Sequence, residues 1–227
     1  DALAHRGPDG EGVWINRRGN AGFAHRRLAV IDLSPAGAQP MHYPSTEEPR
    51  YTIVYNGEIY NYIELKEILQ TKGYIFHTQS DTEVILAAYD CYKENCLGLF
   101  DGMFAFALWD EREQQLFAAR DRFGEKPFFY HCHNNALYFG SEIKALSAAG
   151  IEKRVDEQVL LYYLASGMSQ SPANRQRTFY RNILSLPPAH YFYYKPDDLH
   201  IQCTRYWDID KTITADKIIN PVERFRE

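Results

Sequence analysis

Three consecutive residues of the chain combine types that could act on an amide: Asn56, Gly57 and Glu58. A β-rich run ending at Tyr55 precedes them, and apolar residues recur at helical intervals from Tyr62 onward. The Asn-Gly pair is therefore predicted to lie at a strand-to-helix turn and not in a hairpin. There the Asn56 amide and the Gly57 N–H can both face a ligand, which makes them a candidate oxyanion hole. Glu58 is a candidate partner for a cationic group.

A second acidic group lies at the predicted start of another helix. Ser80 and Glu83 have capping-box spacing, which places Asp81 in the first helical turn. The helix dipole favours the ionised form of a carboxyl group there. Taken alone, this pattern indicates no more than a stabilised helix start, so a binding role for Asp81 depends on the motifs around it.

Four further motifs complete the set. They are His5 to Gly10 (HRGPDG), Ala24 to Asp32 (AHRRLAVID), Gly102 to Ala107 (GMFAFA) and Arg120 to Pro127 (RDRFGEKP). In this order and at these spacings, the set closely resembles the glutaminase domain of glutamine-hydrolysing asparagine synthetase, a class II glutamine amidotransferase of the N-terminal nucleophile hydrolase type. The similarity runs from residue 5 to about residue 149. It continues in the stretches 178–183, 186–190 and 205–208, which look like the segment leading into the family's synthetase domain.

The nucleophile that the resemblance implies is missing from the sequence. The family uses a cysteine at the mature N-terminus, whose own α-amino group is the general base. This chain begins with Asp1, and its cysteines are all internal: Cys91, Cys96, Cys132 and Cys203. We therefore expect that the sequence lacks the start of the natural domain and that the chain as given is inactive.

The resemblance implies a role for each candidate residue in binding a γ-glutamyl amide. Arg27 matches the arginine that binds the α-carboxylate, and its planar fork suits a bidentate pair. Glu58 and Asp81 match the acidic residues that bind the α-ammonium. Asn56, through its side chain, and Gly57, through its backbone N–H, match the oxyanion hole. Without the family match, the arginine would be interpreted as a surface residue and the Asn-Gly pair as an ordinary turn.

Other polar groups are interpreted as structural. Arg6 and Asp9 are expected to hold a loop, and we assign them no catalytic role. The segment 120–127 is interpreted as a strand ending in a glycine turn. His131 and His133 lie on one face of a predicted strand, but no second Cys or His cluster stands at zinc-ligand spacing, so no metal site is expected.

Composition excludes several classes of partner. The chain of 227 residues has 25 Lys and Arg against 30 Asp and Glu, a formal net charge of -5, which gives no basic footprint for nucleic acid. No apolar run approaches the ~20 residues needed to span a bilayer, so no membrane partner is expected. Four cysteines without a secretion signal fit reduced thiols and a cytoplasmic location. A homodimer is left open.

The expected fold class is α+β, because strands and helices come in blocks and do not alternate singly. The resemblance implies a four-layer αββα sandwich of N-terminal nucleophile hydrolase type, with its N-terminal strand missing and the first two helices on one outer face. Residues 1–149 are expected to form the amidotransferase domain, incomplete at its N-terminus, and residues 150–227 a segment leading toward an absent synthetase domain. Strands are predicted at 12–15, 22–25, 29–32, 51–55, 103–110, 115–120, 127–132, 136–140 and, as an edge strand, 191–194; helices are predicted at 61–72, 81–95, 142–148 and 157–164.

The resulting hypothesis is the glutaminase domain of an asparagine synthetase-like amidotransferase. In the intact protein the resemblance implies thiolate attack on glutamine, a glutamyl thioester, and release of ammonia to a synthetase domain in cis. That domain would use ATP and Mg to activate aspartate, whereas no cofactor is expected in this chain itself. Two alternatives stay open: an amidotransferase for another carboxylate such as a sugar acid, and a non-catalytic glutamine-binding module.

Overall fold

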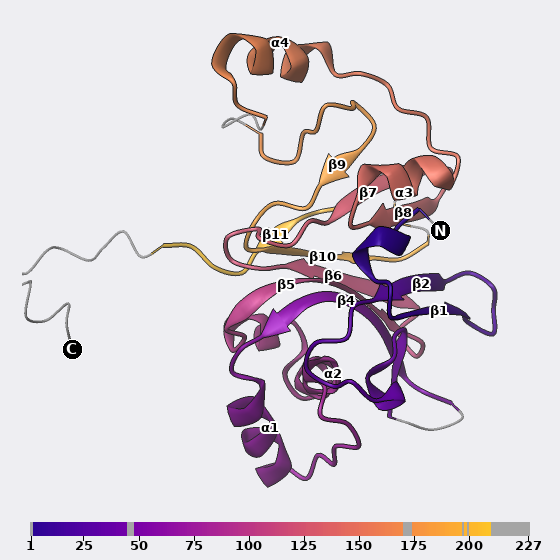
Figure 1. Cartoon of the computed structure of the whole chain (residues 1–227), viewed down its shortest axis with the longest axis vertical. Coiled ribbons are helices and arrows are strands. Elements are labelled where there is room, and N and C mark those ends of the chain that lie inside the picture. The colour runs from indigo at the N-terminus through magenta and orange to yellow at the C-terminus, as the bar shows by residue number, and fades with distance from the viewer. Residues whose placement is uncertain (1, 45–47, 170–173, 197, 199, 210–227) are drawn as a thin grey trace, which may run out of the picture.

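A six-stranded sheet forms the centre of the molecule (Figure 1). The computed structural model describes residues 2–44, 48–169, 174–196, 198 and 200–209. Neighbouring strands of the sheet pair in the order β11-β10-β6-β5-β4-β3, and every pairing is antiparallel. The strands are β3 (Met41–Tyr43), β4 (Tyr51–Ile59), β5 (Gly102–Asp110), β6 (Gln115–Arg120), β10 (His190–Tyr194) and β11 (Thr204–Arg205).

Two helices cover one face of this sheet, α1 (Tyr62–Thr71) and α2 (Asp81–Tyr92) (Figure 1). Every residue from Val84 to Tyr89 is buried, because α2 lies between the sheet and α1. A stacked and edge-on group of aromatic rings, which includes Tyr89, Phe106 and Phe117, fills the space between helix and sheet.

The opposite face of the sheet packs against a second β layer. This layer contains a hairpin and a three-stranded sheet ordered β8-β7-β9. The side chains between the layers include Phe23, Val54, Phe128 and Phe192, which form a second core. Helix α3 packs against β7 and β8 as the fourth layer, whereas α4 lies apart from the sandwich (Figure 1). The elements are β1 (Gly10–Ile15), β2 (Gly22–Arg27), β7 (Phe129–His133), β8 (Ala136–Gly140), β9 (Leu184–Ser185), α3 (Ile143–Ala148) and α4 (Glu157–Ser166).

The order helix, sheet, sheet, helix confirms the expected α+β sandwich of four αββα layers, with the first two helices on one outer face. The domain boundary expected after residue 149 stays a prediction. Strands from beyond that point join both sheets, since β10 pairs with β6 and β9 pairs with β7. Within the described residues, no helix is long and apolar enough to cross a membrane.

Several local predictions were wrong for physical reasons. Asn56 and Gly57 lie within β4 and not at a strand-to-helix turn, because β4 stays paired with β5 as far as Ile59. Residues 29–32 form a loop and not a strand, because the Arg27 guanidinium takes the backbone carbonyls of Asp32 and Ser34 as acceptors. Strand β10 is not an edge strand, since β11 pairs on its outer side. Asn61 and Glu64 have capping-box spacing, which predicts that Asn61 caps the first helix. Its side chain does not cap α1 but bonds Leu99 O and Asp101 N–H.

The capping box predicted at the start of α2 forms only in part. Ser80 Oγ accepts from Thr82 N–H at 3.2 Å, as an N-cap should. The carboxylate of Glu83 instead accepts from the N–H groups of His77 and Thr78. Glu83 therefore fixes the loop that leads into the helix, and Asp81 remains in the first turn, as expected.

Candidate active site

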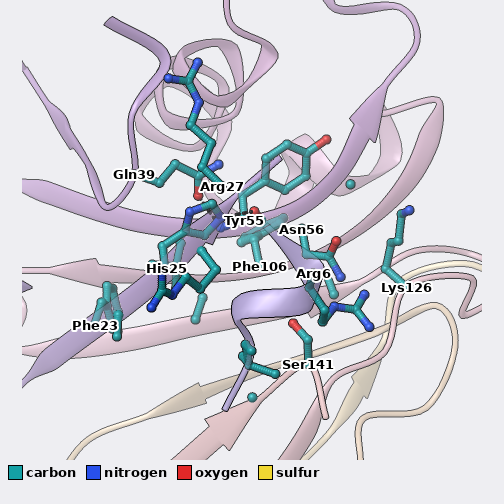
Figure 2. Close-up of a pocket in the computed structure, with 18 of the residues that line it drawn as sticks. Arg6, Phe23, His25, Arg27, Gln39, Tyr55, Asn56, Phe106, Lys126 and Ser141 are labelled. Carbon is teal, nitrogen blue, oxygen red and sulfur yellow. Dashed lines mark hydrogen bonds between the residues drawn. The ribbon is translucent and has the colours of Figure 1, made fainter. Parts of the chain in front are cut away.

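All five residues that the sequence singles out line one cavity of about 790 Å³. The lining includes strands β2 and β4, the loop after β2, the start of α2 and residues of the β7-β8 layer, so the cavity lies between the two sheets. One part of the wall is apolar, with Phe23, Val54 and Phe139. Figure 2 labels some residues of the polar part, among them Arg27, Gln39 and Asn56. The polar part comprises Arg6, His25, Arg27, Gln39, Asn56, Gly57, Glu58, Asp81 and Lys126.

One edge of β4 carries the polar groups of the site. Strand β3 pairs with β4 only as far as Ile53, so the edge beyond that residue has no neighbouring strand in the described part of the chain. Side chains take over there: Gln39 Oε1 accepts from Tyr55 N–H at 2.7 Å, and Asp81 Oδ2 accepts from Ile59 N–H at 3.0 Å. Because alternate residues of a strand turn their N–H groups to the same edge, the N–H of Gly57 lies between these two.

The same alternation explains why position 57 is a glycine. Gly57 is paired with Phe104 of β5, whose N–H and C=O are bonded on the other side, to Asp121. A Cβ atom at residue 57 would lie 2.2 Å from Met103 O and 2.7 Å from Phe104 Cα. Such contacts cannot be relieved without moving backbone, so a side chain here would force β4 and β5 apart.

Asn56 presents a buried donor at the cavity. Its backbone pairs with Ala105 of β5, which fixes the strand beneath it. Its side-chain Nδ2 is shielded from solvent and has no hydrogen-bond partner among the described residues. An unsatisfied buried donor costs roughly 1–3 kcal/mol, which a stable protein rarely tolerates without a functional reason.

Asp81 is a buried carboxyl group with hydrogen-bond donors on one oxygen. It is 4% exposed, and its Oδ2 accepts from the Tyr55 hydroxyl at 2.8 Å and from Ile59 N–H at 3.0 Å. Burial raises the pKa of Asp81 above its usual value despite these bonds, and the nearby Glu58 carboxylate adds to the rise. Two acidic groups thus face the same cavity, and a bound cation would relieve both.

Arg27 is held by the loop that follows β2. Its Nη1 donates to Ser34 O at 2.9 Å, and its Nη2 donates to Asp32 O. Gly37 packs closely against the guanidinium, since a Cβ there would lie 2.7 Å from Nη2. In Figure 2 the Arg27 guanidinium points away from the Asn56 side chain. The site therefore offers a cation and an amide donor at separate places on its wall.

Arg6, to which the sequence analysis assigns no catalytic role, also lines the cavity. It donates to Glu142 Oε1 at 3.1 Å, and His5 Nε2 and Lys144 Nζ also contact this carboxylate. Burial alone would raise the pKa of Glu142, but the hydrogen bonds from Arg6, Lys144 and His5 outweigh it and lower the pKa to about 2. Asp9 accepts from Ala29 N–H at 2.9 Å and so holds the loop, as expected.

Gln39 and His25 were also missed as site residues. Gln39 belongs to a polar loop without periodicity, and only its neighbour Pro40 marks the place. His25 belongs to the motif at residues 24–32, where nothing in the local sequence distinguishes it as a site residue. Its proximity to Tyr55 comes from the packing of β2 against β4, which local sequence does not encode.

The four cysteines lie away from this cavity, none of them among its lining residues. Cys96 is fully buried, and burial raises the pKa of its thiol. Burial also raises the pKa of the Cys132 and Cys203 thiols. A raised pKa keeps a thiol protonated and poorly nucleophilic at neutral pH. No group of three or more metal-ligating side chains occurs in the described ranges.

Comparison with known proteins places the chain in a family. Residues 1–207 match the model of the glutamine amidotransferase domain. The chain is 40% identical over all 227 residues to asparagine synthetase [glutamine-hydrolyzing] 3 of Bacillus subtilis, of which it covers 36%. It is 41% identical over 195 residues, 86% of its length, to asparagine synthetase [glutamine-hydrolyzing] 1 of the same organism, of which it covers 29%.

The fold agrees with these matches. The solved structure of glutamine phosphoribosylpyrophosphate amidotransferase from B. subtilis, complexed with ADP and GMP, superposes with a TM-score of 0.64 at 20% identity. That superposition covers 91% of this chain and 45% of the other. The chain belongs to the glutamine amidotransferase domain family, and it is homologous to the glutaminase domains of asparagine synthetases. It spans only about a third of the length of these curated relatives.

Proposed function

We propose that the cavity binds free glutamine and that the full-length gene product hydrolyses the side-chain amide to glutamate and ammonia. Glutamine carries an α-carboxylate, an α-ammonium group and a carbonyl that becomes an oxyanion when attacked. Arg27 would bind the carboxylate, Glu58 and Asp81 the ammonium, and Asn56 with the Gly57 N–H the oxyanion. The observation that carries the proposal is the buried, unpartnered Nδ2 of Asn56 in the same cavity as two carboxyl groups and a fixed guanidinium.

The electrostatics support a zwitterionic ligand. A raised pKa at Asp81 means that the carboxylate is under-compensated in the protein alone. An ammonium group beside Asp81 and Glu58 would supply the missing charge. An amide ligand without that group would leave the buried Asp81 carboxylate without a cationic partner, so the site would discriminate against it.

The attacking group, by the family resemblance, is a cysteine thiolate beside its own α-amino group. Its sulfur would bond the amide carbon, and the α-amino group would pass the proton taken from the thiol to the amide nitrogen, so that the C–N bond breaks and ammonia leaves. Water would then hydrolyse the thioester to glutamate and the free thiol. We propose that the ammonia reaches a synthetase domain of the same polypeptide, which uses ATP and Mg to amidate aspartate. A cytoplasmic location and a homodimer belong to the same proposal for the whole protein.

The test is a glutamine titration followed by calorimetry and an ammonia-release assay on the full-length gene product. Glutamine should bind and be hydrolysed, whereas glutaramate, which lacks the α-ammonium group, should bind at least tenfold more weakly. Equal binding of the two would contradict the roles of Glu58 and Asp81. Ammonia transfer to a sugar acid in place of aspartate would change the proposed acceptor but leave the glutamine site intact.

A further inference from the structure

The edge of β4 needs support at the point where β3 ends. The pairing of β3 with β4 stops at Ile53, two residues before Tyr55. Both backbone groups of Tyr55 are then taken by side chains from elsewhere in the fold. Gln39 Oε1 accepts from its N–H at 2.7 Å, and His25 Nε2 lies 3.2 Å from its carbonyl oxygen.

The contact with Tyr55 O determines the protonation of His25. A carbonyl oxygen only accepts, so Nε2 must carry the proton that it donates. The other nitrogen, Nδ1, is shielded from solvent and has no hydrogen-bond partner among the described residues. Burial lowers the pKa of His25, and the charge on Arg27 lowers it further, although the bond to Tyr55 acts in the opposite direction. The imidazole is therefore neutral at physiological pH and is available as a fixed N–H donor.

We infer that Gln39 and His25 are positioning residues that hold the peptide before Asn56 so that the oxyanion donors face the scissile amide. This inference rests on the proposed function. The carbonyl of Tyr55 and the nitrogen of Asn56 belong to one planar peptide group, so a bond to that carbonyl also orients the start of Asn56. The N–H of Gly57 lies further along the same edge, so these contacts orient it as well.

The contact between His25 and Tyr55 also affects the distance between the two ends of the proposed glutamine site. His25 lies two residues before Arg27 on β2, and Tyr55 immediately precedes Asn56 on β4. These two strands belong to different sheets. The bond between His25 and Tyr55 O thus sets the separation between the carboxylate-binding arginine and the oxyanion hole. That separation decides whether the amide of glutamine, or that of the shorter asparagine, reaches the donors.

The pairing of β4 with β5 continues along the far edge, from Tyr51 to Ile59. Loss of either side-chain contact should therefore leave the strand in place and change only the orientation of the oxyanion donors at Asn56 and Gly57. A misplacement of about 1 Å in such a site can cost about a hundredfold in rate. The cost should appear in kcat and in the choice between amides more than in folding.

The experiment uses the full-length gene product and two pairs of variants. Gln39→Met and His25→Leu remove the contacts, whereas Gln39→Glu keeps an acceptor oxygen and His25→Gln keeps an N–H donor. We expect kcat for glutamine to fall about 10- to 100-fold in the first pair, with KM changed less than threefold and with weaker preference for glutamine over asparagine. The second pair should recover at least part of the loss. Gln70→Met, on the exposed face of α1, is the matched control and should change nothing.

The outcomes separate the inference from the proposed function. Thermal unfolding of each variant identifies any that fail to fold. The variants that do fold then test the positioning role. If the wild type hydrolyses glutamine and Asn56→Ala loses rate, while Gln39→Met and His25→Leu keep kcat within about twofold, the positioning role is wrong and the glutaminase stands. If the wild type itself releases no ammonia, the proposed function fails and the inference with it.

Discussion

Two buried aspartates, Asp81 and Asp121, show how differently one side chain can be used in the same fold. Asp121 is 0% exposed, and five backbone N–H groups donate to its carboxylate. Four of these belong to the turn at residues 123–126, and the fifth belongs to Phe104 of β5. Asp81 is 4% exposed, but the hydroxyl and N–H donors described above converge on a single oxygen.

The surroundings of the two carboxylates distinguish a structural role from a binding role. The turn after β6 satisfies Asp121 from within the chain, so the charge stabilises the turn and is available for nothing else. Asp81 is buried near a second carboxylate, Glu58, and burial raises its pKa despite its hydrogen bonds. Its location at the cavity wall makes an external cation the natural complement. A buried carboxyl group that lines a cavity and has a raised pKa is the better guide to a ligand site.

The largest expected effect is complete loss of activity. We predict that the 227-residue chain by itself releases no ammonia from glutamine, although it contains both Asp81 and Asp121. None of its four cysteines lines the cavity, and donors to an oxyanion do not provide a nucleophile. An ammonia-release assay against a heat-killed control measures this. Glutamine-dependent ammonia from the chain alone would mean that the nucleophile has been assigned wrongly.

Asn56→Ala should reduce kcat of the full-length gene product about a hundredfold or more. The amide is needed chiefly when charge develops on the carbonyl oxygen, so KM should change little. Like Asp81, Asn56 lines the cavity, and its Nδ2 has no hydrogen-bond partner among the described residues, so the two should behave alike as ligand-directed residues. Steady-state kinetics would count against this role if KM rose while kcat stayed unaltered.

The two aspartates can be compared directly by replacing each with asparagine. Asp121→Asn should destabilise the protein by about 3 kcal/mol or more, because an amide NH2 would face buried N–H donors. Asp81→Asn should change the free energy of unfolding by less than about 1 kcal/mol. It should instead weaken glutamine binding by about 2–5 kcal/mol, since the ammonium loses a buried partner. Urea unfolding and calorimetry give both quantities, and equal stability losses would erase the distinction between the two sites.

Arg27→Lys keeps the charge at the carboxylate end of the cavity but loses the planar fork. Glutamine affinity should fall by roughly 1–3 kcal/mol, because a bidentate pair becomes a single contact. Calorimetric titration is the measurement, with Arg154→Lys in an exposed ion pair as the control. An unchanged affinity in the Arg27 variant would remove this residue from the site.

The smallest expected effect concerns Glu142, a third carboxylate, whose ion pairs are lost when low pH protonates it. Its pKa is lowered to about 2 from an ordinary value of 4.5. Its stabilising contribution is therefore fully present above pH 4.5 and is lost as the pH falls toward 2. Glu142→Gln should flatten this part of the acid unfolding curve by no more than about 1 kcal/mol, because the cluster is partly exposed. Identical acid curves for wild type and variant would show that the cluster contributes nothing.

The sequence carried the layers of the fold and the identity of the main polar groups. The helical spacing of apolar residues predicted α1 and α2, and continuous apolar runs predicted β5 and β6. The loop at residues 29–32 could not be predicted, since its apolar residues resemble a strand and only the carbonyl contacts of Arg27 show otherwise. Gln39 and His25 were missed for a similar reason: their importance comes from one hydrogen bond each across the fold.

The location of the cavity between two sheets has a mechanical consequence. A glutamine molecule that contacted both Arg27 on β2 and Asn56 on β4 would connect the two β layers. Occupancy of the site and cohesion of the sandwich would then be linked by mass action. The ligand would act as a removable part of the core, and slower amide hydrogen exchange in β2 upon addition of glutamine is the sign to look for.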